Sequence, residues 1–277
     1  MNIVRTVLFT SLAMIAFAAN SLLCRAALKH TAIDAASFTS VRLFSGAAML
    51  YVITSMSRNK VKGNWISAMA LFVYAAGFSF AYVRLSAATG ALLLFGAAQA
   101  TMIGHGILKG ERFKKMQLTG LMLALAGLVI LLLPGIAAPP PKASLLMLIA
   151  GAAWGVYSLK GRGKSDPIGV TAGNFLRAAP IALIMSLWMH ESASMDSAGF
   201  LYAAASGALA SGLGYAIWYA ALPLLKATMA ATVQLSVPVI AALGGIAFLG
   251  EPTSLRLVIA SVATLGGIAL VIMERRR

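Results

Sequence analysis

Ten apolar runs, separated by short polar loops, fill nearly the whole length of this chain. A helix needs about 20 apolar residues to cross the hydrocarbon core of a bilayer, and most runs come close to that length. The predicted spans are Val7–Leu28, Ala35–Met56, Trp65–Val83, Ala87–Ile107, Met116–Leu133, Ala143–Leu159, Ile168–Trp188, Ala198–Leu222, Ala227–Phe248 and Leu255–Met273. Since 60% of the residues are hydrophobic and only 10% are charged, a water-soluble core cannot hold them, and we expect an all-α integral membrane protein.

The first run follows Arg5 and has the charge pattern of a signal peptide. It stays apolar as far as Ala27, however, and is too long for the apolar region of a signal peptide, which has about 7–15 residues. We therefore interpret it as the first membrane span.

The second half of the chain repeats the first. A Gly-Glu turn between two apolar runs occurs as GILKGERFKK around Glu111 and again as AFLGEPTSLR around Glu251. The offset is 251 − 111 = 140, and the same spacing relates Gly127 to Gly267. The predicted domains are a five-helix repeat over 1–133, a Pro-rich external linker over 134–142 and a second five-helix repeat over 143–277.

The basic residues gather on one side of the predicted spans, which determines the expected topology. That side carries Arg5, Arg58, Lys60, Lys62, Lys109, Arg112, Lys114, Lys115, Lys160, Arg162, Lys164, Lys226, Arg275, Arg276 and Arg277. Cytoplasmic loops are rich in Lys and Arg, so we expect both termini in the cytoplasm and the two Gly-Glu turns on opposite faces. The repeats would then be inverted, as in many transporters. The net charge of +15 follows from this topology, and we expect no nucleic-acid partner.

The stretch ALPLLKATMAATVQLSVPVIAALGGIAFLGEP, which ends at Pro252, resembles EamA-type members of the drug/metabolite transporter superfamily. The resemblance covers essentially the full length, and the ten-span pattern is similar to the YddG-type exporters of aromatic amino acids. It implies the ten-helix drug/metabolite transporter fold, a bacterial-type inner membrane and export of hydrophobic or aromatic amino acids or related metabolites. The first half departs from the family pattern, since GALLLFGAAQATMIGH lacks the proline found at Pro238.

Two arginines, Arg42 and Arg177, lie well inside the predicted spans. An ionisable group there costs about 2.5–3.5 kcal/mol and needs a reason to be present. One of them can orient an anionic group such as an amino-acid carboxylate, which suits the guanidinium fork. Alternatively, both are structural, and bond to backbone carbonyls or extend towards an interface.

Aromatic and uncharged polar residues inside the spans complete the predicted substrate site. The aromatic candidates are Tyr74, Phe78, Phe95, Trp154, Tyr157 and Tyr215, which would line a cavity suited to flat side chains. The polar candidates are Asn20, Ser79, Gln99, Gln234 and Ser236, with Pro238 as a gating residue at a kink. The alternatives are lipid contact or an aromatic belt for the rings, and interhelical hydrogen bonds for the polar groups.

The sequence favours a carrier over an enzyme or a channel. His30, His105 and His190 are dispersed, no HExxH motif occurs and the acidic residues lie at helix ends or in loops, so we expect no metal, cofactor or catalytic residue. No charge ring or filter of a channel is visible either. Because no acid lies deep in a span, we expect a facilitator and not a proton-coupled carrier. The alternative to an exporter of amino acids is an EamA-type drug or sugar-type metabolite carrier. The expected partners are a small-molecule substrate and the bilayer, with the protein a monomer or homodimer.

Overall fold

The computed structural model describes residues 3–57, 60–110, 114–135, 138–161, 165–225, 230 and 233–274. Helices dominate, and no strand occurs within these ranges. The helices are α1 (Ile3–His30), α2 (Ala35–Met56), α3 (Trp65–Tyr82), α4 (Ala87–Leu108), α5 (Lys115–Leu132), α6 (Pro141–Gly161), α7 (Pro167–Trp188), η1 (His190–Ser192), α8 (Ser197–Ala205), η2 (Ser206–Leu213), α9 (Gly214–Ala221), η3 (Leu222–Leu224), α11 (Ser236–Leu249) and α12 (Leu255–Glu274). In the described part of the chain, nine helical segments are long and apolar enough to cross a membrane and α11 is a shorter apolar helix. The predicted all-α membrane fold is therefore confirmed.

Polar side chains mark the starts of several spans. The side chains of Asp34, Asn64 and Ser86 accept hydrogen bonds from backbone N–H groups in the first turns of α2, α3 and α4. Those N–H groups have no partner within the helix, so an oxygen at this position stabilises the helix start. The capping residues thus explain why the predicted starts of these three spans agree with the structure.

Asp34 also joins two loops at one end of the bundle. Its carboxylate accepts from the backbone N–H of Ser194 at 3.0 Å, and its own N–H donates to the Ser194 carbonyl at 2.9 Å. Burial acts to raise the pKa of Asp34, but hydrogen bonds from Ser37, Ser194 and Ala36 outweigh it, so the pKa lies below its ordinary value. The carboxylate is therefore held in its charged form at neutral pH.

The eighth span differs from a regular α-helix. It runs continuously over Ser197–Leu224, but its middle section, η2, is a π-helix between α8 and α9. Such segments rotate the following residues relative to a regular helix and are frequent at functional sites. Nothing in the apolar pattern of the sequence predicted this change.

The ninth span is interrupted where one continuous helix was predicted. The expected helix Ala227–Phe248 is interrupted by a turn at Leu235, and α11 begins only at Ser236; residues 226–229 and 231–232 lie outside the described part. Pro238 is responsible, because a residue without an N–H fits the first turn of a helix and disrupts its interior. The interruption lies three residues before Pro238, where the kink was expected, and the gating role of Pro238 stays a prediction.

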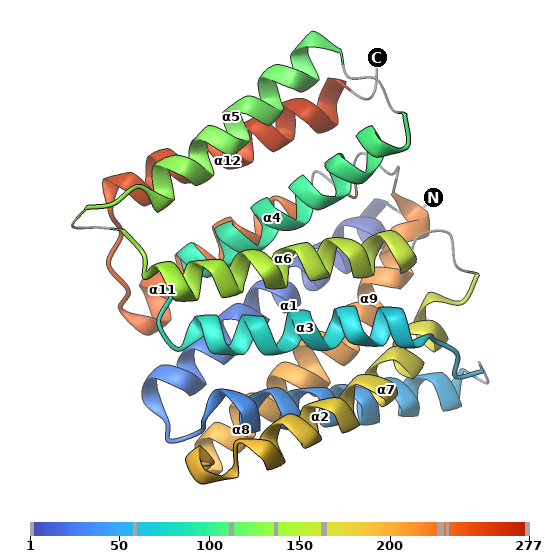
Figure 1. The fold of residues 1–277 in the computed structure, drawn as a ribbon. Coiled ribbons are helices and arrows are strands. Elements are labelled where there is room, and N and C mark those ends of the chain that lie inside the picture. The colour runs from blue at the N-terminus through green and yellow to red at the C-terminus, as the bar shows by residue number, and fades with distance from the viewer. Residues whose placement is uncertain are drawn as a thin grey trace.

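Helices α5 and α12 lie side by side (Figure 1), and their contacts follow a local two-fold axis. A Cβ atom on Gly120 would lie 2.6 Å from the carbonyl oxygen of Gly267, and one on Gly127 would lie 2.8 Å from that of Ala260. Ala260 and Gly267 follow Gly120 and Gly127 by 140 residues each (260 − 120 and 267 − 127). The two contacts therefore exchange when the halves are exchanged, and the helices run antiparallel.

The remaining helix contacts obey the same exchange. When the halves are exchanged, α1 corresponds to α6, α3 to α9 and α4 to α11. The pair α3–α6 then becomes α9–α1, the pair α4–α6 becomes α11–α1, and all four pairs are in contact. Helices α2 and α7, which occupy corresponding places in the two halves, pack on each other. This is the arrangement expected of two inverted five-helix repeats. The domain limits at residues 133 and 143 stay a prediction.

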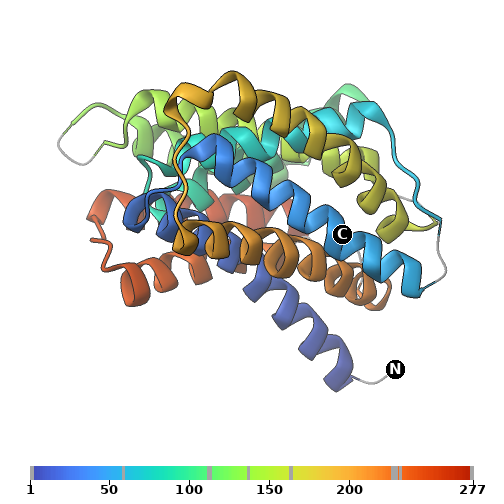
Figure 2. The ribbon, with the colours of Figure 1, turned by 90° about the horizontal axis from the view of Figure 1, so that it is seen from below.

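Both termini lie at the same end of the bundle (Figure 1). The loops that follow α2 and α4 lie at this end too, and they carry the basic residues Lys60, Lys62, Lys109 and Lys114. Figure 2 shows the first turns of α1 projecting away from the other helices, where Val4 is 69% and Val7 60% exposed. These apolar side chains suit contact with lipid.

Candidate functional site

Aromatic side chains from both halves of the chain meet around Trp154 on α6. Its ring centroid lies 4.9 Å from that of Tyr74 on α3, 5.5 Å from that of Tyr157 on α6 and 5.6 Å from that of Tyr215 on α9. The planes of Trp154 and Tyr215 are inclined by only 16°. Separations of this size are favourable for aromatic pairs, so the cluster presents flat apolar surfaces inside the bundle.

A small cavity adjoins this cluster. It is lined by Phe17, Asn20, Ser21, Tyr74, Phe78, Leu94, Phe95, Trp154, Ala210, Ser211, Tyr215 and Gln234. Its volume of about 30 Å³ has room for one or two water molecules, whereas ligand sites usually enclose about 300–1,000 Å³. The cavity as it stands is therefore too small for an amino acid.

The cavity brings together about half of the residues predicted to bind substrate. The predicted residues that line it are Asn20, Tyr74, Phe78, Phe95, Trp154, Tyr215 and Gln234. The predicted residues that lie outside its lining are Arg42, Ser79, Gln99, Tyr157, Arg177 and Ser236. Burial of Tyr74 and Phe95, which are 5% and 7% exposed, argues against an interfacial aromatic belt for these two rings.

A buried hydrogen-bond chain runs from the cavity to Arg42. The amide of Asn20 donates to the Tyr74 hydroxyl at 3.2 Å and accepts from Ser206 at 2.6 Å. Arg42 Nη2 donates to the same Tyr74 hydroxyl at 2.9 Å. Three helices and the π-helix η2 therefore position one polar network directly behind the aromatic wall.

Arg42 is almost completely buried, with 1% of its surface exposed. Its guanidinium carbon lies 5.1 Å from the ring centroid of Tyr74 and 4.8 Å from that of Phe78. Both distances are typical of cation–π contacts, which partly compensate a desolvated cation. Of the two structural alternatives predicted for this residue, extension towards an interface is therefore wrong.

Arg177, its counterpart in the second half, has a different environment. Its Nη1 atom donates to the backbone carbonyls of Lys62 at 3.0 Å and Gly173 at 2.7 Å. This position ties α7 to the loop before α3 at the end of the bundle that carries the termini. Its contacts match the predicted structural role, bonding to backbone carbonyls.

Other predicted residues outside the lining make local contacts. Ser79 donates to the Ala75 carbonyl on the same helix, and Ser236 donates to the Val233 carbonyl at the start of α11. Tyr157 donates to Thr171 at 3.4 Å. Gln99 is buried on α4, about one turn beyond Phe95.

Several lining residues escaped the sequence prediction, namely Phe17, Ser21, Leu94, Ala210 and Ser211. Phe17 shares a helix face with both Asn20 and Ser21, because it precedes them by three and four residues. That spacing could have identified Phe17. Ser211 sits in the π-helix η2, where a regular helical pattern gives the wrong face, and its buried hydroxyl has no hydrogen-bond partner among the described residues.

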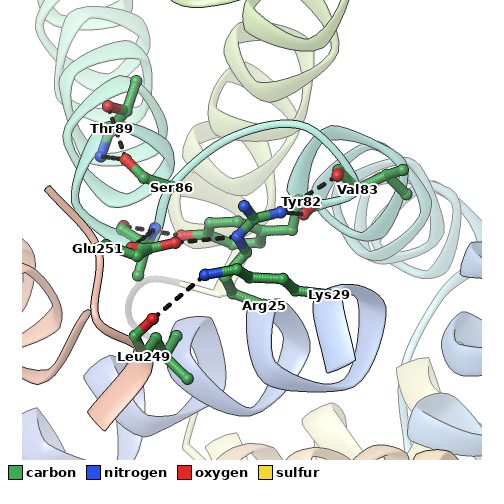
Figure 3. Close-up of polar contacts among 9 residues, drawn as sticks. Arg25, Lys29, Tyr82, Val83, Ser86, Thr89, Leu249 and Glu251 are labelled. Carbon is green, nitrogen blue, oxygen red and sulfur yellow. Dashed lines mark hydrogen bonds and ion pairs between the residues drawn. The ribbon is translucent and has the colours of Figure 1, made fainter. Parts of the chain in front are cut away.

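An ion pair joins Arg25 on α1 to Glu251 in the turn between α11 and α12 (Figure 3). Arg25 Nε lies 2.9 Å from Glu251 Oε1, and Glu251 Oε2 accepts from the backbone N–H of Ala87 at 2.7 Å. Arg25 also donates to the carbonyls of Tyr82 and Val83. The turn between α11 and α12 is thereby joined to α1 and to the loop between α3 and α4.

The two Gly-Glu turns keep one shared backbone feature. Gly110 and Gly250 both have positive φ, of 85° and 60°, which glycine adopts without strain. Glu111, the partner of Glu251 in the repeat, lies outside the described residues. The contacts of Glu251 therefore describe the turn at one end of the bundle and carry no statement about the turn around Glu111.

The cavity offers chemistry for binding. It supplies aromatic faces, hydroxyl and amide groups and, one residue behind the wall, a positive charge. Within the described ranges, no three His, Cys, Asp or Glu side chains gather as metal ligands. A helical membrane bundle with a local two-fold axis and a cavity between its halves belongs to the class of membrane transporters with inverted repeats.

Comparison with known proteins defines the family. Residues 141–273 match the EamA-like transporter family. A Pseudomonas aeruginosa protein named Uncharacterized protein PA1977 is 59% identical over 274 residues, which cover 98% of this chain and 96% of that protein. The chain belongs to the EamA-like transporter family, which points to a transporter of small substrates and not to an enzyme.

A solved crystal structure is similar in its fold. It superposes with a TM-score of 0.65 over 96% of this chain and 99% of the other, at 19% sequence identity. At that identity the likeness concerns the fold alone. It agrees with the packing of the ten helices described above.

Proposed function

We propose that this protein is a secondary transporter that exports small aromatic or hydrophobic amino acids, or related metabolites, across the bacterial inner membrane. The observation that carries the proposal is the cavity whose aromatic walls come from both halves of the chain. Carriers with inverted repeats bind their substrates near the middle of the bilayer, between the repeats. The family assignment supports the same class of activity.

The aromatic cluster suits a flat side chain. An indole or phenyl ring could stack against Trp154, Tyr74 or Tyr215 in place of their present mutual contacts. Each good aromatic pair contributes about 0.5–1.5 kcal/mol beyond burial. A sugar gains less from such faces, because its hydroxyl groups need many hydrogen-bond partners.

Transport would proceed by alternating access. The contracted cavity of about 30 Å³ must expand before it can accept an amino acid, so we propose that the helices around it separate at one end at a time. The Arg25–Glu251 ion pair would hold the end away from the termini closed. With both termini in the cytoplasm, this closed end is the periplasmic one.

Uptake into proteoliposomes tests the proposed function. Purified protein should move labelled L-tryptophan and L-phenylalanine faster than L-leucine, and D-glucose no faster than liposomes without protein do. As a facilitator, it should give the same initial rate with and without a pH gradient. A preference for glucose would refute the aromatic substrate class, and dependence on the pH gradient would refute the facilitator mechanism.

A further inference from the structure

Arg42 carries a buried positive charge with incomplete compensation. Its Nε and Nη1 atoms have no hydrogen-bond partner among the described residues. The ion pair found among the described residues joins Arg25 and Glu251. No described carboxylate is therefore paired with Arg42. The neighbouring groups that do contact Arg42 are neutral, namely the Tyr74 hydroxyl and the rings of Tyr74 and Phe78.

Such a charge interacts strongly with an anion. Inside a protein the screening of charges is much weaker than in water, so an arriving negative group gains more than it would at the surface. Buried donors without partners also favour any ligand that accepts their hydrogen bonds. The planar guanidinium, with its two free donor atoms, matches a carboxylate.

The Tyr74 hydroxyl connects this charge to the cavity. Arg42 and Asn20 both donate to the Tyr74 oxygen, so the hydroxyl hydrogen remains to be donated to another acceptor. Tyr74 and Phe78 contact the guanidinium and also line the cavity. The Ser211 hydroxyl, which faces the same cavity without a partner among the described residues, can donate a further hydrogen bond.

We infer that Arg42 and Tyr74 bind the carboxylate of the substrate, so that the carrier accepts aromatic carboxylates and rejects aromatic amines without a carboxylate. This inference rests on the proposed function and names the charged end of its substrates. The ring would lie against Trp154, while the carboxylate would accept the Tyr74 hydrogen bond and be attracted by the Arg42 charge. The substrate anion would then be the counter-ion that the helices themselves do not provide.

Competition for tryptophan uptake separates the two ends of the substrate. Proteoliposomes take up labelled L-tryptophan in the presence of excess indole-3-propionate, which has a carboxylate and no amine, or of tryptamine, which has an amine and no carboxylate. With the wild-type protein, indole-3-propionate should compete and tryptamine should not. If tryptamine competed as well as indole-3-propionate, the proposed role of Arg42 would be refuted. This competition experiment uses the wild-type protein alone.

Substitution of Arg42 tests the residue itself. Arg42→Gln should raise the KM for tryptophan by about 10- to 100-fold, because the carboxylate loses the attraction of a poorly screened positive charge, and abolish the advantage of indole-3-propionate over tryptamine. Arg42→Lys keeps the charge and should restore part of that advantage. The matched control is Arg256→Gln, since Arg256 donates to the Leu133 carbonyl and neither residue lines the cavity.

Thermal unfolding separates binding from a structural role. A purely structural Arg42 would make Arg42→Gln less stable, whereas removal of an unpaired buried charge should leave the melting temperature unchanged or higher. An unchanged KM in Arg42→Gln would refute the inference. Absence of tryptophan uptake by the wild-type protein would instead refute the proposed function, so the two failures can be told apart.

Discussion

Trp154 contacts three aromatic rings in and beside the cavity wall, as many as Tyr215 does. Its ring packs against Tyr74, Tyr157 and Tyr215, which come from α3, α6 and α9. These neighbours fix its orientation through side chains from both halves. At the scale of the residue, Trp154 is therefore the surface on which we expect a flat substrate to lie.

Trp154→Ala should lower tryptophan transport by about tenfold, because a substrate ring loses a stacking surface worth about 1 kcal/mol together with apolar contact area. The measurement is the initial rate of uptake into proteoliposomes, normalised to the amount of folded protein. Trp188→Ala is the control, since Trp188 is 88% exposed and lies outside the cavity lining. Equal rates for Trp154→Ala and wild type would exclude Trp154 from the site.

Arg177→Gln should affect stability and leave the KM for substrate unchanged. Its guanidinium donates to the Lys62 carbonyl in the loop before α3, and a charged hydrogen bond of this kind contributes about 1.5–3 kcal/mol when shielded. Because Arg177 is only partly buried, we expect the lower end of that range, or less. Melting curves in detergent provide the measurement, and a raised KM at unchanged stability would contradict it.

At the scale of elements, the turn between α11 and α12 depends on Glu251. Its side chain is 6% exposed, and that of Arg25 is 14% exposed, so the ion pair is shielded from solvent. Glu251→Gln should lower the free energy of unfolding by about 1–3 kcal/mol and increase solvent access at this end of the bundle. A double-mutant cycle with Arg25→Gln measures the coupling, and additive effects would show that the pair does not hold the helices together.

The contact of α5 with α12 requires glycine at position 267 but not at the adjacent position 266. A Cβ atom at Gly267 would meet the backbone of Gly120 and Ala124, whereas one at Gly266 would have no other atom within 4 Å. Gly267→Ala should therefore cost about 1–3 kcal/mol through overpacking, and Gly266→Ala should be neutral or slightly stabilising. Melting temperatures of the two variants test this, and equal values would contradict the close helix contact.

At the scale of the whole molecule, the inverted repeat requires the two Gly-Glu turns to face opposite compartments. Cys24 is fully buried, and its replacement by Ala gives a background for single cysteines at Lys109 and Thr253, one in each turn. A membrane-impermeant maleimide added to intact cells with a permeable outer membrane should label position 253 and leave position 109 unlabelled until the inner membrane is opened. Labelling of both positions from the same side would contradict the two-fold arrangement.

The sequence by itself determined the spans and their symmetry. Apolar length and basic loop residues are local properties, so the starts of α2, α3 and α4 and the Gly110 and Gly250 turns could be predicted without tertiary structure. The aromatic candidates Tyr74, Trp154 and Tyr215 could be predicted for the same reason, because large rings within spans are visible in the sequence. The 140-residue offset likewise related Gly127 to Gly267, and the exchanged contacts of α5 and α12 agree with that correspondence.

Only the tertiary structure decided which side chains meet. Arg42 and Arg177 occupy similar places in the two repeats, yet one lies behind Tyr74 and the other bonds to the Lys62 carbonyl. The π-helix η2 turns Ser211 towards the cavity, and a turn at Leu235 interrupts the ninth span before α11. These outcomes depend on the rotation of each helix about its axis and on contacts between residues far apart in the chain, neither of which an apolar pattern encodes.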